Sequence, residues 1–253
     1  MVLPNMHLKQ LTINEGSIVS DIVKHDYRTA DVFRRHDIEY CCGGRWPLET
    51  VCDSKGINFR DLKKELEAAG RTVQLFNNLP YHNWNVDFLT GYIVNVHHYY
   101  LRNAMPVTGE MIKHFAEGHE KKYPHMQEVY VLFEKLAADL LPHLRYEEEI
   151  IFPYVCQVLH AHENNDSYAT LLVKTLRKPL DAMIAQEHTL VEAPIFKIRA
   201  LTNNYSVPEG ACVSHKVALL RLKELDNDLM QHMYLENEVL FPRAMKIEKE
   251  LLR

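Results

Sequence analysis

Residues 139–153 read DLLPHLRYEEEIIFP, and residues 228–242 read DLMQHMYLENEVLFP. Both segments follow the pattern D-L-x-x-H-x-x-x-E-x-E-x-x-F-P; seven of the fifteen positions are identical, and the copies start 89 residues apart. In a helix, positions i and i+4 share a face, with Cβ atoms about 5–6 Å apart. The His and the Glu of each copy can therefore reach one metal ion. A single H-x3-E pair is common on helix surfaces, but its duplication favours a metal site.

A further histidine lies about one helix upstream of each copy. His98 precedes the first repeat histidine by 45 residues, and His188 precedes the second by 44. Four helices would thus supply four imidazoles and two carboxylates to the interior of a bundle, as in carboxylate-rich di-iron bundles. Imidazole together with carboxylate suits iron, manganese or zinc, and no cysteine shares the spacing. The predicted metal ligands are His98, His143, Glu147, His188, His232 and Glu236.

The chain from residue 86 onward has a helical pattern. Apolar residues recur at spacings of three and four, for example at Val129, Leu132, Phe133 and Leu136. Long helices joined by short loops form an up-down four-helix bundle, so the predicted fold class is all-α. The four helices are predicted near 86–121, 124–160, 167–202 and 209–249.

Residues 1–75 predict a small helical domain. The stretch 71–85 contains Asn77, Asn78 and Pro80, which are typical of a linker. The predicted domains are therefore 1–75 and 86–253. Helices in the first domain are predicted near 17–24, 28–40 and 58–69, from start signals such as Asn58.

Composition narrows the possible partners. The 253 residues carry a formal net charge of −5, with basic residues scattered among acidic ones, which argues against a nucleic-acid partner. No run of about 18 uncharged apolar residues occurs, so we expect no membrane span. No secretory signal is recognised, so we expect a cytoplasmic protein. The five cysteines are odd in number and irregularly spaced, which does not indicate a disulfide framework.

The vicinal pair Cys41–Cys42 has two interpretations. Helix dipoles and a nearby Arg34, Arg35 or Arg45 could lower the pKa of a thiol and make it reactive. The pair could also be buried as two small apolar side chains, as free cysteines often are. The residues alone leave both open.

Other polar residues near the repeat are secondary candidates. Asp139 and Asp228 lie one turn before the repeat histidines, and Glu187 adjoins a predicted ligand; each could accept an imidazole N–H or be an ordinary surface carboxylate. His97 points about 100° away from its neighbour around the helix, so the neighbour is preferred as a ligand. His119 is too far along a continuous helix and stays a reserve candidate, since Pro106 could break that helix.

At this point the residues resemble a known family. DVFRRHDIEYCCGG, residues 31–44, resembles the short N-terminal domain of the iron–sulfur cluster repair di-iron proteins. The H-x3-E-x-E-x-x-F-P pair resembles their hemerythrin-like domain. The likeness extends from about residue 15 to 245 and includes the order of the domains. Two departures are a longer stretch between Glu147 and His188, and Asp139 where a glutamate is common.

The resemblance implies a function and a cofactor. It implies a cytoplasmic stress protein, typically a homodimer, that helps restore iron–sulfur clusters damaged by nitric oxide or peroxide. Its clients would be the damaged iron–sulfur proteins, to which it supplies iron from a labile site. That site would hold two non-haem Fe ions, bridged by Glu147 and Glu236 and by an oxo group. The thiol motif of the family falls on Cys41 and Cys42.

Three functions compete on the sequence alone. The first is an iron donor for cluster repair, which the fused cysteine domain favours. The second is an enzyme that reduces nitric oxide at the di-iron pair, since open coordination positions would remain. The third is a hemerythrin-like carrier or sensor of O2 or NO; hemerythrins usually supply a fifth histidine, and only four are matched here.

Overall fold

The computed structural model describes residues 13–41, 44–69, 79–175, 180 and 193–252. Within these ranges the chain is helical, which confirms the all-α prediction. The described residues contain one isolated β-bridge, between Ile18 and Pro47, and no β-strand. None of the described helices is both long enough and apolar enough to cross a membrane.

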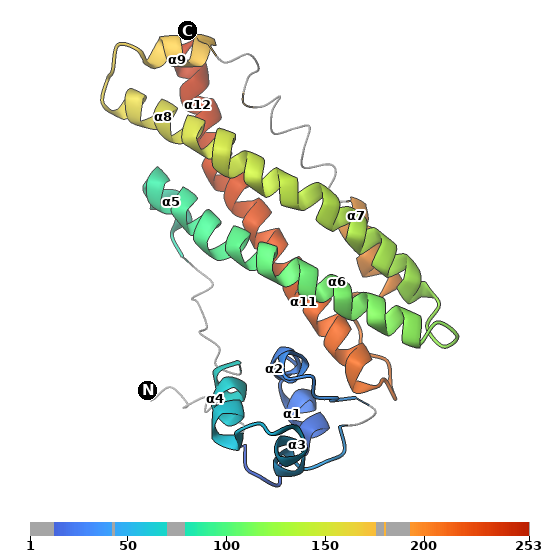
Figure 1. Cartoon of the computed structure of the whole chain (residues 1–253). Coiled ribbons are helices and arrows are strands. Elements are labelled where there is room, and N and C mark those ends of the chain that lie inside the picture. The colour runs from blue at the N-terminus through green and yellow to red at the C-terminus, as the bar shows by residue number, and fades with distance from the viewer. Residues whose placement is uncertain (1–12, 42–43, 70–78, 176–179, 181–192, 253) are drawn as a thin grey trace, which may run out of the picture. The chain divides into compact units, whose positions relative to one another are not determined.

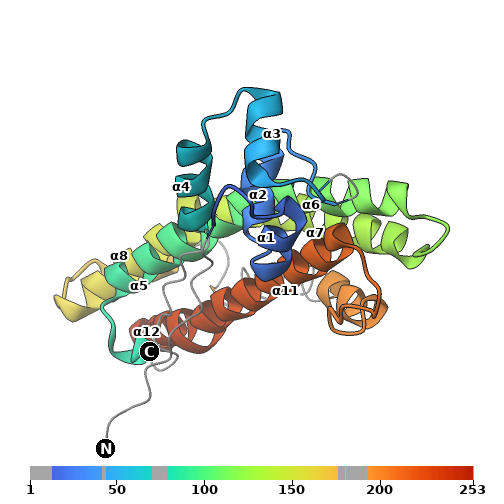
Figure 2. The same cartoon turned by 90° about the horizontal axis from the view of Figure 1, so that it is seen from below.

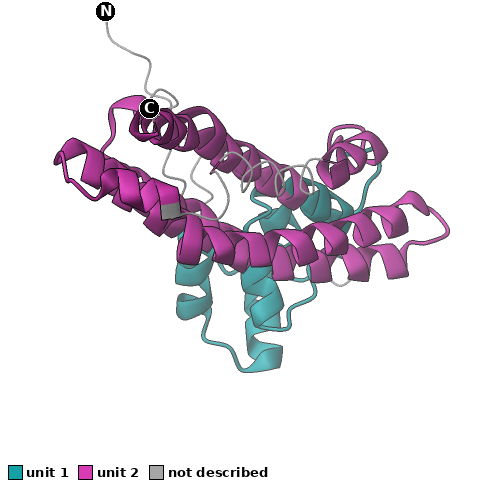
Figure 3. Ribbon diagram, turned by 90° about the horizontal axis from the view of Figure 1, so that it is seen from above, with its two compact units in different colours: residues 1–76, 207–220 teal, residues 77–206, 221–253 magenta. Residues whose placement is uncertain are grey.

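Packing divides the chain into two compact units (Figure 3). The first comprises residues 1–76 and 207–220, and the second comprises 77–206 and 221–253. The first unit therefore includes a segment that lies far away in the sequence. The domain bounds 1–75 and 86–253 stay a prediction.

The first unit contains four short helices before the linker (Figure 1). Their apolar faces bury Val19, Phe33, Leu48 and Leu62, each fully shielded from solvent. Asn58 accepts hydrogen bonds from the backbone N–H groups of Arg60 and Asp61, the second and third residues of the last of these helices, as expected for a start signal. The helices are α1 (Val19–His25), α2 (Thr29–Arg35), α3 (Leu48–Lys55) and α4 (Phe59–Ala69).

Two predictions in this unit were wrong. Helix α2 ends at Arg35 instead of near 40, because Asp37 takes a left-handed φ of 53°. The N–H of Ile38 then bonds back to the carbonyl of Phe33 at 2.8 Å, which closes a Schellman cap. Helix α3 was not predicted; it ends at Gly56, whose φ of 66° suits only a residue that tolerates the left-handed region.

From residue 86 onward, the described chain forms long helical rods in which α segments are joined by short π-helical segments. The first rod is α5 (Val86–Tyr92), η2 (Ile93–His98) and α6 (Tyr99–Gly118); the second is α7 (His125–Tyr146), η3 (Glu147–Ile151) and α8 (Phe152–Glu163); the last is α11 (Val213–Tyr234), η4 (Leu235–Leu240) and α12 (Phe241–Leu251). These match the predicted first, second and fourth helices. Of the third, α9 (Ala169–Thr175) and the helical residues 193–201 are described.

The first two rods lie side by side, as Figures 1 and 2 both show. Helix α6 packs along α7, α5 packs on α8, and α8 packs on α12. The apolar core between them includes Ile93, Phe152, Val155, Leu235 and Phe241, all buried. This core surrounds the middle of the rods, where the π-helical segments lie.

Candidate metal centre

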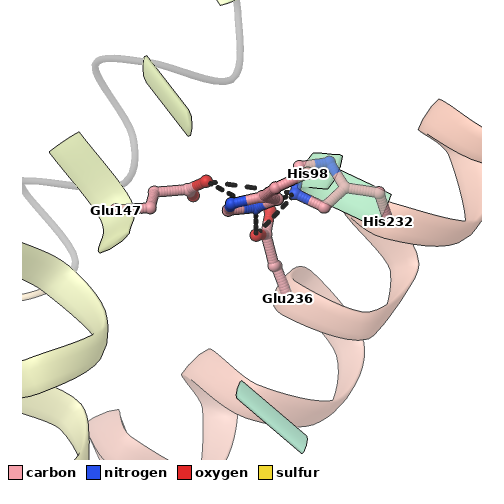
Figure 4. A group of neighbouring side chains, drawn as sticks. All are labelled: His98, Glu147, His232 and Glu236. Atoms are coloured by element: carbon pink, nitrogen blue, oxygen red, sulfur yellow. Dashed lines mark hydrogen bonds and ion pairs between the residues drawn. The ribbon is translucent and has the colours of Figure 1, made fainter. Parts of the chain in front are cut away.

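Four of the predicted ligands come together between the rods (Figure 4). Ligand atoms of His98, Glu147, His232 and Glu236 all lie within 4.8 Å of one another. The Nε2 atoms of the two imidazoles are 2.9 Å apart, and the Nε2 of His232 lies 2.8 Å from Oε1 of Glu236. The first two residues come from the first and second rods, and the other two from the last rod. We call these four residues the buried His/Glu group.

The π-helical segments position this group. His98 is the last residue of η2, Glu147 is the first residue of η3, and Glu236 lies inside η4. A π turn widens the helix by one residue and is found mostly at functional sites. Each described rod therefore departs from α geometry at the point where it contributes to the group, and spacing arguments based on 3.6 residues per turn cannot predict this.

The two other predicted ligands have different outcomes. His143 lies one turn before Glu147, and its Nε2 is 3.2 Å from Oε1 of that glutamate. The i, i+4 pair of the first repeat therefore faces one way, as the spacing predicts. His188 lies outside the described residues.

Burial sets the electrostatics of the group. The exposed fraction of each of the four residues is 0 or 1 %. Burial raises the pKa of Glu147, and the carboxylate of Glu236 raises it further. Burial also favours a higher pKa for Glu236. The charge of His232 and hydrogen bonds from both imidazoles outweigh burial, so the pKa of Glu236 is lowered. For His232, the nearby Glu236 outweighs burial and raises the pKa.

The donor set fits a metal ion. Oε2 of Glu147 and Oε2 of Glu236 are buried and accept no hydrogen bond from any described residue. Two carboxylates with unshared lone pairs beside two imidazoles form a hard-to-intermediate donor set, which suits iron, manganese or zinc. Such oxygens are costly to bury unless a cation neutralises them. The buried His/Glu group can thus hold a metal ion.

Glu148 is a contact that the sequence interpretation missed. Its Oε1 lies 2.7 Å from Nδ1 of His98, on the side of the ring opposite the group. Arg102, one turn further along the first rod, also bonds to this carboxylate. A carboxylate behind a ligand histidine is a common arrangement in metal sites. Glu149, in contrast, is exposed.

The secondary carboxylates lie elsewhere. Asp228 pairs with Nδ1 of His97 at 3.0 Å, not with either imidazole of the buried His/Glu group. His97 is itself buried, with its ring edge-on to Tyr92 at 5.5 Å between centroids. Asp139 is half-buried, and its Oδ2 is buried without a hydrogen bond to any described residue. Glu187 lies outside the described residues.

His119 does not join the centre. Helix α6 continues through Pro106 to Gly118, so the expected break at this proline does not occur. His119 follows as the cap residue, with Nδ1 placed 3.1 Å from the carbonyl of Phe115. His98 directly precedes α6 and His119 directly follows it, so the two histidines are separated by the full length of this helix.

Cys41 has a partner that the sequence did not indicate. It is half-buried, and its side chain hydrogen-bonds with that of Cys212, just before α11 in the same compact unit. Gly44 lies close to the backbone of Tyr40: a Cβ on Gly44 would lie 2.5 Å from the carbonyl oxygen of Tyr40, so only glycine fits. Cys42 lies outside the described residues.

Known proteins resemble both parts of the chain. Residues 15–70 match the ScdA_N family, described as a domain of unknown function (DUF542), and residues 92–244 match the hemerythrin HHE cation binding domain. A probable iron-sulfur cluster repair protein of Haemophilus influenzae is 27% identical, over 85% of this chain and 90% of its own length. The iron-sulfur cluster repair protein ScdA of Staphylococcus epidermidis is 26% identical, over 92% of this chain and 99% of its own.

A third relative is also named as an iron-sulfur cluster repair protein. The iron-sulfur cluster repair protein YtfE of Yersinia pestis is 25% identical, over 87% of this chain and 93% of its own length. The hemerythrin match spans more than half of the chain and includes every residue of the buried His/Glu group. The chain therefore belongs to the hemerythrin HHE cation binding family, with an ScdA_N domain in front of the hemerythrin domain.

Proposed function

We propose that this protein repairs damaged iron–sulfur clusters by supplying iron to the proteins that hold them. The observation that carries the proposal is the buried His/Glu group, whose ligand atoms lie within 4.8 Å of one another. It stands in a chain whose relatives are named as iron–sulfur cluster repair proteins along nearly their whole length. In this proposal iron is the cargo that leaves the centre.

The centre would hold two non-haem iron ions. The two glutamates would bridge the ions together with an oxo group, and the imidazoles would be terminal ligands. When bound, the ions would offer open positions to small ligands such as nitric oxide or dioxygen. The proposed ligands are His98, His143, Glu147, His188, His232 and Glu236.

Apolar residues near the buried His/Glu group support the proposal that it holds iron. Phe152 stacks on the ring of His98 at 5.6 Å between centroids, and it belongs to the same buried apolar cluster as Ile93 and Leu235. The imidazoles of His98 and His232 are buried, and an apolar shell around a metal site limits the access of solvent to it. We further propose that the protein acts in the cytoplasm as a homodimer, on iron–sulfur proteins damaged by nitric oxide or peroxide.

The test is reactivation of a damaged enzyme. A hydratase whose [4Fe–4S] cluster has been damaged by nitric oxide is mixed anaerobically with the iron-loaded protein, or with the same amount of free ferrous iron. We expect the protein to restore more activity than free iron does. Equal recovery with both iron sources would contradict the proposal.

Two histidine variants sharpen this test. His232→Ala removes a buried imidazole of the group and should lower the bound iron and the reactivation together. His160→Ala removes a histidine of α8 that is 41% exposed and pairs with Asp87, so it serves as the matched control and should retain both. Iron content is measured by plasma emission spectroscopy on protein purified without chelators.

A further inference from the structure

A series of aromatic rings runs from the surface of the second unit to the buried His/Glu group. The ring of Trp84 lies 5.2 Å from that of Tyr92, and the ring of Tyr92 lies 5.5 Å from that of His97, between centroids. The ring of His97 lies in turn 6.2 Å from that of His232, a member of the group. Centroid distances of about 4.5–7 Å are those of aromatic side chains in contact. The four rings therefore form a continuous path between a half-buried tryptophan and a proposed metal ligand.

The outer end of this path is open to solvent and fixed in place. Trp84 is half-buried and packs edge-on against Phe88, at 4.7 Å between centroids, and Phe88 is 58% exposed. The backbone carbonyl of Trp84 accepts a hydrogen bond from Arg243 of α12 at 2.8 Å. A small molecule in solution can therefore reach the indole, while the bond to α12 holds this residue at the end of the path.

Tyr92 and His97 share a charged neighbour. Oδ1 of Asp228 lies 3.0 Å from Nδ1 of His97, and this pairing orients the imidazole. The other oxygen of Asp228, Oδ2, is buried and has no hydrogen-bond partner among the described residues. Burial raises the pKa of Tyr92, and interactions with Tyr81 and Asp228 raise it further, so Tyr92 is a neutral phenol at neutral pH. A phenol that loses an electron also loses its proton, and the carboxylate of Asp228 is a nearby acceptor for that proton.

We infer that Trp84, Tyr92 and His97 form an electron route between the surface and the centre, through which the protein reduces peroxide. This inference rests on the iron centre proposed above. Among aromatic side chains, phenol and indole give up a single electron most readily, whereas electron transfer slows steeply with distance. Short steps between neighbouring rings therefore let an oxidising equivalent leave the ligand histidines before it damages them.

Reduction of hydrogen peroxide along this route takes two electrons from the protein. Bound ferric iron supplies the position at which the peroxide reacts, and it is ferric again at the end. Cleavage of the O–O bond to give two water molecules consumes two electrons and two protons. Tyr92 and Trp84 each supply one electron and one proton, from the phenolic O–H and the indole N–H, and become neutral radicals. Two molecules of a low-molecular-weight thiol then return two hydrogen atoms at the surface and join as a disulfide.

Trapping of the tyrosyl radical tests the inner part of the route. The iron-loaded protein is oxidised to the ferric state, freed of unbound iron, mixed with hydrogen peroxide and freeze-quenched for electron paramagnetic resonance spectroscopy. We expect a tyrosyl signal that narrows when the protein contains ring-deuterated tyrosine. Tyr92→Phe keeps the ring and removes the oxidisable phenol, so it should lose most of this signal. Tyr168→Phe makes the same change at a position that is 54% exposed, and as the matched control it should keep the signal.

A second variant tests the outer step. Trp84→Phe keeps an aromatic ring against Phe88 and removes the oxidisable indole. When a low-molecular-weight thiol is added after the peroxide, the tyrosyl signal should decay several-fold more slowly in Trp84→Phe than in the unmodified chain, because the thiol then lacks the relay to Tyr92. Trp46→Phe, at a position that is 62% exposed, should decay at the unmodified rate.

Oxidation products separate the route from attack by oxidant in solution. The chain has two tryptophans, the half-buried Trp84 and the exposed Trp46. Oxidant in solution would modify Trp46 first, whereas the route delivers oxidation to Trp84. Peptide mass spectrometry of peroxide-treated protein without thiol should therefore show several-fold more oxidation at Trp84 than at Trp46. Tyr92→Phe should abolish this preference and leave the iron content unchanged.

Two results would overturn the inference. One is oxidation of Trp46 that equals or exceeds that of Trp84 in the unmodified chain, and the other is a radical signal that survives unchanged in Tyr92→Phe. If iron binding and reactivation of the damaged enzyme persisted in that case, the proposed function would stand without the route. A chain that binds no iron would refute both.

Discussion

The surroundings of Cys212 shift the pKa of its thiol in opposite directions. Burial raises its pKa, and backbone N–H groups of His215 and Ser214 at the start of α11 lower it. The neighbouring side chain of Cys41 raises it again, both by charge and by a hydrogen bond to the protonated thiol. The net shift is upward, so Cys212 is mainly protonated at neutral pH.

This shift predicts how the thiol reacts. Only the thiolate is alkylated, so Cys212 should react with iodoacetamide more slowly than a free cysteine at pH 7.5, and its rate should rise with pH beyond the point where a free thiol saturates. The rate is followed by mass spectrometry of the tryptic peptide. Cys41→Ser removes the neighbour that raises the pKa and should speed the reaction several-fold at pH 7.5. An unchanged rate in Cys41→Ser would show that the two thiols do not interact.

At the same scale, the four residues of the buried His/Glu group are among those that the sequence pattern selects, and their role as metal ligands stays a prediction. The i, i+4 spacing of the repeat selects Glu147, His232 and Glu236. His98 is selected by its distance of 45 residues upstream of the first repeat histidine, which matches the 44 residues in the second half. Glu148 was missed because its contact is with a different rod, and no spacing within its own helix signals it. The pairing of Asp228 with His97 was missed for the same reason.

At the scale of elements, the long rods could be predicted and the short helices only partly. The rods carry many apolar residues at helical spacing, so single errors do not change the result. Helix α3 has only Leu48 and Cys52 buried, so its period is weak, although Gly56 is a readable stop. The π segments could not be predicted, because apolar residues at a spacing of three and four do not distinguish a π turn from an α turn.

An ion-pair network joins residues 193–201 to α11. Asp226 is 4% exposed and accepts two hydrogen bonds from Arg199, each at 2.6 Å, and one from the hydroxyl of Tyr205 at 2.8 Å. Tyr205 follows Asn203 and Asn204 in a run of three residues with left-handed φ. The network therefore holds a strained turn against the last rod.

Breaking this network should be costly. Asp226→Ala leaves the guanidinium of Arg199 partly buried without a counter-charge, and such a loss typically costs about 3–5 kcal/mol. We expect the free energy of unfolding to fall by about 3 kcal/mol, measured by urea denaturation monitored by circular dichroism. Lys223→Ala, an exposed position three residues earlier, is the control and should change it by less than about 0.5 kcal/mol. If Asp226→Ala lowers the free energy of unfolding no more than Lys223→Ala does, the ion pair only offsets the cost of removing its two charges from water.

At the scale of the whole molecule, the centre places four ionisable side chains where a protein core is usually apolar. Three of the rods meet there, and each contributes at least one member of the buried His/Glu group. Burial raises the pKa of Glu147, and repulsion from the neighbouring carboxylate of Glu236 raises it further. A bound metal ion replaces this repulsion with bonds that tie the rods together.

Metal binding should therefore stabilise the folded chain. A ligand that binds only the folded state stabilises it by about 4 kcal/mol at a concentration 1,000 times its Kd. For a chain of this size each kcal/mol corresponds to about 2–4 °C, so ferrous or manganous ions should raise Tm by about 10 °C over the chelated protein. Differential scanning calorimetry under argon measures the shift. His232→Ala should abolish most of the rise, because the remaining group offers one imidazole and two carboxylates, while His160→Ala should keep it. If the unmodified chain melts at the same temperature with and without metal, the buried His/Glu group is a polar core and not a metal centre.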